Sequence, residues 1–409
     1  MPGFMRRGSA QRSAATFILG AGLVASVAGL GAVTASTAGA IAKVTLLPRL
    51  PSKTSVSPSF AAVAVVPHSK DAFAVGSWYT ETGSGDVIEE WNGSAWKEMT
   101  PPTLTGATQA GLNGVWAASA SDVWAVGSIS TTSTQTLQLI HWNGKAWSSE
   151  IVTGVPAGAS LSAISGSSAS NIWAVGSSLD DLTETASALE LHFGGTSWRS
   201  TSEGPADGFL YGVAVASATK AWIVGAGGSK SVPFVLDLEG TTWKQVGSPA
   251  PKDGYLSGVS ASGSTAWAVG GVSGSKTSTL FAMEWTGSKW VSEKVPSPTG
   301  VYPRMTAVVT VSSSLAWLAG VVSNTKNTDY GAFVEKFTKG KWSVGSLPVA
   351  GNGSYIGGLA AAASSDVWGV GSDFTGKICS TPERTITYHY TSSWKLVATP
   401  SFSASTAHC

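Results

Sequence analysis

Charged side chains are scarce in this chain of 409 residues. Lys and Arg number 25 and Asp and Glu number 24, so charged residues make up 12%, about half of the roughly 25% found in an ordinary soluble domain. The formal net charge is +1, and a neutral chain lacks the basic surface that electrostatic binding to nucleic acids requires. Nucleic-acid binding is therefore excluded as the main activity.

Cysteine is nearly absent, and several catalytic motifs are missing altogether. The two cysteines exclude a disulfide-dense scaffold and a zinc site built on three or four thiolates. The sequence has no nucleophile elbow, no P-loop and no dinucleotide-binding fingerprint. Glycine, with 49 residues, and tryptophan, with 18, are abundant instead, and the hydrophobic content of 43% is too high for global disorder.

The N-terminus has the pattern of a signal peptide. Three arginines (Arg6, Arg7 and Arg12) precede an uncharged apolar stretch at 14–33, and A-x-A cleavage sites follow at 38–40 and 40–42. We expect 1–42 to be cleaved, which makes the mature chain secreted or attached to the cell surface. The alternative is an uncleaved anchor, because about twenty residues can span a bilayer. Arg6-Arg7 leaves the choice between Sec and twin-arginine export open.

A repeat fills the rest of the chain. A string such as Asp-Val-Trp-Ala-Val-Gly occurs seven times, with its last glycine every 45 to 51 residues, and a second Trp follows each glycine after 18 to 23 residues. The strings lie at 71–76, 122–127, 171–176, 220–225, 265–270, 315–320 and 366–371. The second Trp is Trp96, Trp147, Trp198, Trp243, Trp290, Trp342 or Trp394.

Each repeat predicts four short strands, which we name a to d in chain order. Strand a is small and apolar, strand b is the Trp-Ala-Val-Gly string, strand c ends in a large residue, and strand d carries the second Trp. Asn-Gly pairs such as Asn92-Gly93 separate c from d, and they favour tight hairpin turns. We expect the strand-b glycine to let neighbouring sheets approach closely, with the Trp filling the wedge between them.

Seven four-stranded units at this period predict an all-β fold, a seven-bladed β-propeller at 60–400. An open β-solenoid is the alternative. Residues 43–47 resemble the ends of strands d, so we expect 43–59 to form an N-terminal clasp strand and linker that closes the ring in the last blade. Residues 401–409 are expected to form a C-terminal tail.

The strand-b and strand-d pattern resembles secreted bacterial propellers of the kelch or galactose-oxidase-like type and of the Asp-box type. Gly270-Gly271 matches the glycine doublet of kelch repeats, and the Val-Trp-Ala-Val strings are also similar to tectonin-type lectin propellers. The resemblance covers about 60–400 and implies the propeller fold. No active-site residue is carried over from it.

Candidate catalytic and metal-binding residues are few. His141, His192 and His389 lie in three different repeats, too far apart to share a metal. Asp180, Asp181 and Glu184 share one b–c loop and could bind calcium, although a solvated acidic loop is the favoured interpretation. We expect no catalytic residue, no metal and no cofactor.

The two cysteines are predicted to form a disulfide. Export permits a bridge between Cys379 and Cys409, and their number is even. Two free thiols are the alternative. A bridge would attach the C-terminal tail to the b–c loop of the seventh repeat.

The sequence favours a non-catalytic, monomeric binding or scaffold protein at the cell exterior, with a glycan or an extracellular protein as its partner. A glycan-active propeller enzyme, a hydrolase or lyase, is the alternative. An enzyme of that kind would bring carboxylates to the channel mouth, whereas the seven copies of strand a contain no Asp, Glu or His.

The ligand site is predicted at one mouth of the channel, on the face that carries the variable b–c loops. The residue expected just before each strand a would surround this mouth: Ser59, Gly111, Ser160, Phe209, Tyr255, Arg304 and Tyr355, with Tyr211 and Tyr302 nearby. Aromatic and Arg side chains on four consecutive blades suit sugar stacking or peptide anchoring. Two other interpretations remain: these side chains only plug the channel, or the site is the loop with Trp78 and Tyr79. Trp78 and Trp116 are the two tryptophans that the repeat does not explain.

Overall fold

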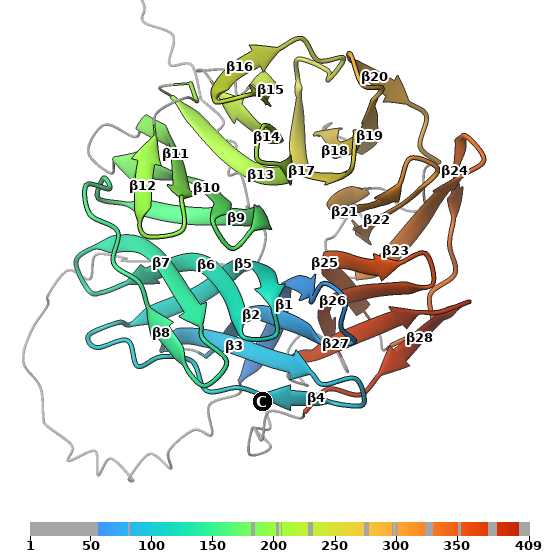
Figure 1. Cartoon of the computed structure of the whole chain (residues 1–409). Coiled ribbons are helices and arrows are strands. Elements are labelled where there is room, and N and C mark those ends of the chain that lie inside the picture. The colour runs from blue at the N-terminus through green and yellow to red at the C-terminus, as the bar shows by residue number, and fades with distance from the viewer. Residues whose placement is uncertain are drawn as a thin grey trace, which may run out of the picture.

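A computed structural model shows the chain as a closed ring of seven sheets around a central channel (Figure 1). It describes residues 56–80, 82–180, 185–201, 204–205, 207–227, 232–273, 278–296, 298, 302–323, 330–350, 353–374 and 383–400. Each sheet consists of four consecutive antiparallel strands, and within the described ranges every element is a strand. The predicted seven-bladed β-propeller is confirmed. No helix in the described part of the chain is long and apolar enough to cross a membrane.

The four strands of each blade follow one another from the channel outward (Figure 1). Strands a are β1 (Ser57–Val65), β5 (Gln109–Ser119), β9 (Ala159–Ser168), β13 (Gly208–Ser217), β17 (Gly254–Ser262), β21 (Arg304–Ser312) and β25 (Gly353–Ala363). Strands b are β2 (Ala72–Tyr79), β6 (Asp122–Ser130), β10 (Asn171–Asp180), β14 (Lys220–Gly227), β18 (Thr265–Ser273), β22 (Leu315–Ser323) and β26 (Asp366–Phe374). Blade 1 is β1–β4, blade 2 is β5–β8, and so on to blade 7, β25–β28.

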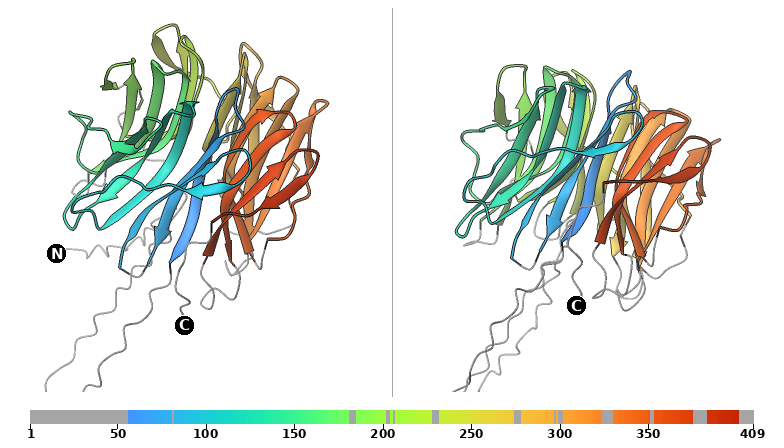
Figure 2. Two further views of the ribbon diagram at one scale, coloured as in Figure 1. Left: turned by 60° about the horizontal axis from the view of Figure 1, so that its bottom comes forward. Right: turned by 90° about the horizontal axis from the view of Figure 1, so that it is seen from below.

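The outer two strands complete each blade. Strands c are β3 (Ser84–Trp91), β7 (Gln135–Trp142), β11 (Thr185–Phe193), β15 (Val232–Glu239), β19 (Ser278–Trp285), β23 (Tyr330–Thr338) and β27 (Glu383–Tyr390). Strands d are β4 (Trp96–Glu98), β8 (Trp147–Ser149), β12 (Trp198–Thr201), β16 (Thr242–Val246), β20 (Trp290–Glu293), β24 (Lys341–Val344) and β28 (Trp394–Val397). Seen from the side, the strands run from one face of the ring to the other (Figure 2). We call the face with the b–c loops the b–c face and the opposite one the a–b face.

The two repeated aromatic positions meet across every seam between blades. The strand-b ring of one blade packs edge-on against the strand-d Trp of the next blade, and aromatic pairs prefer this geometry. The centroid distances are 4.9–6.4 Å. The pairs are Phe73–Trp147, Trp124–Trp198, Trp173–Trp243, Trp222–Trp290, Trp267–Trp342, Trp317–Trp394 and Trp368–Trp96.

The last of these pairs closes the ring. Trp368 of blade 7 lies 5.3 Å from Trp96 of blade 1, and both belong to one buried cluster with Phe60 and Val370. The described part of blade 7 already has four strands of its own. In the predicted clasp and linker, 57–59 belong to β1, while 43–55 lie outside the described residues, as do 1–42 and 401–409.

The strand-b glycines do not act as expected at the seams. A Cβ on any of the seven would lie only 1.8–2.1 Å from a strand-a carbonyl oxygen of the same blade. The cause is a β-bulge, because strand a carries one extra residue immediately after the residue that pairs with the glycine. The extra residues are Ala61, Asn113, Ser162, Tyr211, Ser257, Thr306 and Gly357. Glycine is therefore required for contact within the blade rather than between blades.

Candidate ligand site at the channel mouth

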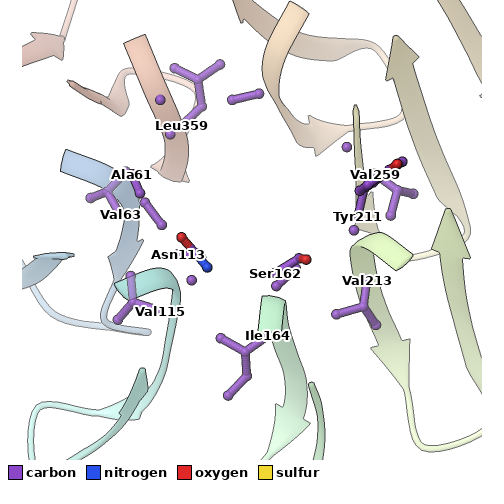
Figure 3. Close-up of a pocket in the computed structure, with 18 of the residues that line it drawn as sticks. Ala61, Val63, Asn113, Val115, Ser162, Ile164, Tyr211, Val213, Val259 and Leu359 are labelled. Atoms are coloured by element: carbon purple, nitrogen blue, oxygen red, sulfur yellow. The ribbon is translucent and has the colours of Figure 1, made fainter. Parts of the chain in front are cut away.

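The central channel is narrow and carries almost no titratable groups. Strands a form its wall, and the cavity measures about 180 Å³. Side chains such as Val63, Asn113 and Ser162 surround the open space (Figure 3). Tyr211 is the one titratable side chain among the described lining residues. Drug-sized ligands occupy pockets of at least roughly 300 Å³, so this cavity is too small to enclose a ligand of that size.

Polar bulge residues hold neighbouring blades together around the channel. Asn113 Nδ2 donates to the Leu161 carbonyl at 2.9 Å, linking blade 2 to blade 3. Ser257 Oγ donates to the carbonyl oxygen of Met305 at 2.9 Å, and Thr306 Oγ1 donates to that of Ile356 at 2.5 Å. These hydrogen bonds from side chains to carbonyl oxygens cross three of the seven seams and help to fix the channel wall.

The predicted mouth residues lie inside the strands a rather than just before them. Pairing with strand b continues past the bulge, as in the pairs Phe209–Ala226, Tyr255–Gly271 and Tyr355–Ser372. The strands therefore begin earlier than the sequence suggested. We call these seven residues the mouth ring: Ser59, Gly111, Ser160, Phe209, Tyr255, Arg304 and Tyr355.

The large members of the mouth ring on blades 4 and 5 pack against residues of their own blades. The Phe209 and Tyr211 rings lie 6.2 Å apart and nearly parallel, at 6°. A Cβ on Gly271 would lie 3.2 Å from the Tyr255 hydroxyl, so the Tyr255 side chain covers Gly271, the residue after the repeated strand-b glycine. Burial raises the pKa of Tyr255, and the charge of Arg304 acts in the opposite direction. The Arg304 side chain is exposed, and Tyr302 is half-buried beside it.

The structure joins Tyr79 to the mouth. Ser77 Oγ donates to the Tyr79 hydroxyl at 2.7 Å, and Tyr79 acts electrostatically on Tyr355 across the seam between blades 7 and 1. Burial, and to a smaller extent Tyr79, raises the pKa of Tyr355 to about 12. Tyr79 of blade 1 therefore influences one member of the mouth ring, Tyr355 of blade 7.

The two unexplained tryptophans have packing roles. The Trp78 ring lies over Gly85, where a Cβ would approach it to 2.5 Å, and it packs against the cluster between blades 7 and 1. Trp116 lies over Gly166 of blade 3 and packs against the cluster between blades 2 and 3. Trp78 remains partly exposed, so a contact with a ligand is open to it as well.

Three histidines on the a–b face have structural roles: each lies within hydrogen-bond distance of the first residue of its strand b and stacks on the strand-b Trp. His141 Nε2 lies 2.8 Å from Asp122 Oδ1, and its ring stacks on Trp124 at 4.1 Å. His389 repeats this arrangement with Asp366 and Trp368, and His192 does so with Asn171 and Trp173. Among the described residues, no group of three or more His, Cys, Asp or Glu could hold a metal. Asp181, Glu184, Cys379 and Cys409 lie outside the described residues.

Two exposed carboxylates at the b–c face were missed in the sequence. Asp207 and Asp253 stand two positions before Phe209 and Tyr255, at the start of strands a in blades 4 and 5. The signal that could have found them is a repeated string, Pro-x-Asp-Gly-aromatic-Leu, which occurs at 205–210 and 251–256. Exposed carboxylates thus immediately precede two strands a, although strand a itself has none.

No protein-family model matches the chain, and no curated protein sequence is detectably similar to it. Solved propeller structures are similar in fold. The GH74 enzyme of Niastella koreensis has a TM-score of 0.52 and 11% identity, covering 86% of this chain and 68% of its own. YCF48 from Cyanidioschyzon merolae has a TM-score of 0.50 and 12% identity, covering 83% and 96%. The Aleuria aurantia lectin, solved with Fucα1-6GlcNAc, has a TM-score of 0.46 and 12% identity, covering 72% and 97%. At these identities the similarity shows the fold alone.

Proposed function

We propose that this chain is an exported, non-catalytic propeller that binds a glycan at the channel mouth on its b–c face. The asymmetry of the mouth ring carries the proposal. Blades 4 to 7 present Phe, Tyr, Arg and Tyr, whereas blades 1 to 3 present Ser, Gly and Ser. We infer that blades 4 to 7 offer large side chains for stacking, whereas the small side chains of blades 1 to 3 leave space for the ligand.

The chemistry of the aromatic side suits a sugar. Phenyl and phenol rings offer flat apolar faces, and the tyrosine hydroxyls and the Arg304 guanidinium offer hydrogen bonds at their edges. A sugar ring likewise combines an apolar C–H face with a rim of hydroxyl groups. The same side chains are common in protein hot spots, so an extracellular protein is the second class of partner.

A glycan-active enzyme is the second candidate function, and one observation favours it. Asp207 and Asp253 place carboxylates on adjacent blades at the mouth, and glycosidases act through a pair of carboxyl groups. Binding is preferred because the described channel lining offers Tyr211 as its one titratable side chain. Turnover assays on a polysaccharide panel, run beside a glycan array, separate the two functions: product release would support the enzyme.

The mouth is tested with the triple variant Tyr255→Ala, Arg304→Ala and Tyr355→Ala. Loss of two aromatic platforms and a cation should weaken binding of any glycan found on the array by at least about 100-fold. The matched control is Val344→Ala with Leu396→Ala, which trims exposed apolar side chains on the outer strands β24 and β28. Circular dichroism and thermal melts establish that both proteins are folded. Undiminished affinity in the triple variant would exclude this mouth as the site.

A further inference from the structure

Blades 4 and 5 begin with the same local sequence. The string Pro-x-Asp-Gly-aromatic-Leu runs at 205–210 and at 251–256. In blade 5 the Gly254 N–H donates to the Pro251 carbonyl at 2.9 Å, which closes a tight turn with Asp253 exposed at its corner. In blade 4 a Cβ on Gly208 would lie 3.2 Å from the Pro205 carbonyl oxygen, so glycine is favoured at the same point. Asp207 is exposed as well.

Turn formation alone does not explain the whole string. Asp and Gly are favoured residues of tight turns, so the turn accounts for those two positions. It does not account for the aromatic residue that follows. Blade 3 has Pro156 at the corresponding place, yet it continues with Gly158 and Ser160. A proline before strand a therefore does not by itself require a carboxylate or an aromatic ring at these positions.

In both blades the string puts a carboxylate one glycine away from a mouth-ring aromatic. Phe209 and Tyr255 are half-buried and held against their own strands b, opposite Ala226 and Gly271. They are therefore fixed platforms, whereas Asp207 and Asp253 are exposed acceptors. An ionised carboxylate accepts up to four hydrogen bonds and donates none. The partner that fits such a pair is a ring with an apolar face and vicinal hydroxyl donors on its edge.

We propose that blades 4 and 5 carry twin sugar subsites, Asp207–Phe209 and Asp253–Tyr255, and that the ligand is an oligosaccharide of at least two rings. This inference rests on the proposed glycan-binding function and specifies its ligand. The subsites belong to neighbouring blades of one ring, and the proposal assigns both to a single chain of linked sugars. Linking the two rings makes the second contact intramolecular, which raises affinity without any new contact.

The test is isothermal titration calorimetry with one homologous series, from the monosaccharide to the hexasaccharide, of whichever neutral glycan binds on the array. The variants are Asp207→Asn, Asp253→Asn and the double variant, which keep the turn but replace an ionised acceptor with a neutral amide. The control is Glu239→Gln, which also removes one negative charge from blade 4 but lies 54% exposed on the a–b face.

We expect two weak monosaccharide sites per chain and tighter, one-to-one binding of the oligosaccharides. Each single variant should leave one monosaccharide site and lower oligosaccharide affinity about tenfold, since hydrogen bonds to charged groups are the stronger ones. The double variant should lose about 100-fold, and Glu239→Gln should match the wild type. One monosaccharide site in the wild type, or a double variant with wild-type affinity, would overturn the twin subsites while leaving glycan binding intact. A protein that binds no glycan of any class would overturn the proposed function itself.

Discussion

Two rings of residues lie one position apart on the innermost strands, and they differ in how much their side chains vary. The first is the mouth ring, which ranges from glycine to tyrosine and arginine. The second consists of the next residue in each blade, which is always large, apolar and at most 2% exposed. Its members are Phe60, Leu112, Leu161, Leu210, Leu256, Met305 and Ile356.

The bulge explains this difference. The buried residue pairs directly with the strand-b glycine and fills the seam between blades, so both its backbone and its side chain are constrained. In the mouth ring the constraint common to all seven blades is on the backbone, because its carbonyl oxygen occupies the space that a Cβ of the glycine would need. The side chain itself differs from blade to blade. The fold thus fixes the backbone at seven equivalent positions, whereas the side chain at each position differs between blades.

The largest effect is expected from replacing a strand-b glycine. A Cβ on Gly270 would lie 1.8 Å from the Tyr255 carbonyl oxygen and 2.8 Å from Leu256 Cα, both backbone atoms of β17. Gly270→Ala should therefore cost more than about 5 kcal/mol, the exceptional end of single substitutions, and leave blade 5 unable to pair. Yield of soluble protein and thermal unfolding measure the effect.

A matched substitution isolates the role of the bulge. Gly247 has an ordinary φ and no atom within 4 Å of its Cβ position, so Gly247→Ala should be neutral within about 0.5 kcal/mol. If Gly270→Ala unfolds at the temperature of Gly247→Ala, the carbonyl contact does not constrain the fold.

The ring and its seams could be predicted from the sequence, whereas the bulge could not. Seven phased pairs of aromatic residues are enough to predict seven sheets, and in the structure the strand-b aromatic of each repeat contacts the strand-d Trp of the next repeat across a seam. The partner of the glycine depends on the register of strands a and b. One extra residue such as Ser257 changes that register without changing the apolar pattern.

The candidate site was predictable only where it follows the repeat. Tyr255 and Tyr355 could be found because they occupy the same position in their blades. The proximity of Tyr79 to Tyr355 was not predictable, because these residues come from opposite ends of the chain and meet only when the ring closes. Asp207 and Asp253 immediately precede strands a, so the repeated pattern of the strands does not include them.

One strand-c position that is apolar in blades 2 to 5 holds a buried glutamate in blades 1 and 6, and these glutamates give the second prediction. On strand c the position of Ile140, Leu191, Leu236 and Met283 is held by Glu89 in blade 1 and by Glu335 in blade 6. Both glutamates are 0% exposed, and their oxygens have no hydrogen-bond partner within the described residues. Burial raises the pKa of Glu89 to about 8, with a smaller contribution from Glu98, and burial raises the pKa of Glu335 to about 7.

Removing the charge of Glu89 should stabilise the protein at alkaline pH. A raised folded pKa means that the folded state holds the proton more tightly, so stability falls as pH rises from about 4.5 to about 8. Glu89→Gln should be near neutral at pH 4 and more stable than wild type by on the order of 4 kcal/mol at pH 9. Denaturant unfolding at both pH values measures the difference. Glu335→Gln should also stabilise the protein at alkaline pH, and its gain in stability should develop at lower pH because the pKa of Glu335 is lower than that of Glu89. A gain in stability that does not depend on pH would contradict the explanation.

The smallest effect on stability is expected in the mouth ring itself, and two adjacent residues provide the comparison. Met305 is 2% exposed in the cluster between blades 5 and 6, so Met305→Ala should cost about 2–5 kcal/mol. Arg304, one position earlier, is exposed, and Arg304→Ala should change stability by no more than about 0.5 kcal/mol. Chemical denaturation of the two variants under identical conditions gives both values. A cost for Arg304→Ala as large as that for Met305→Ala would mean that the mouth ring plugs the channel as part of the core, and the freedom that distinguishes it from the buried ring would be lost.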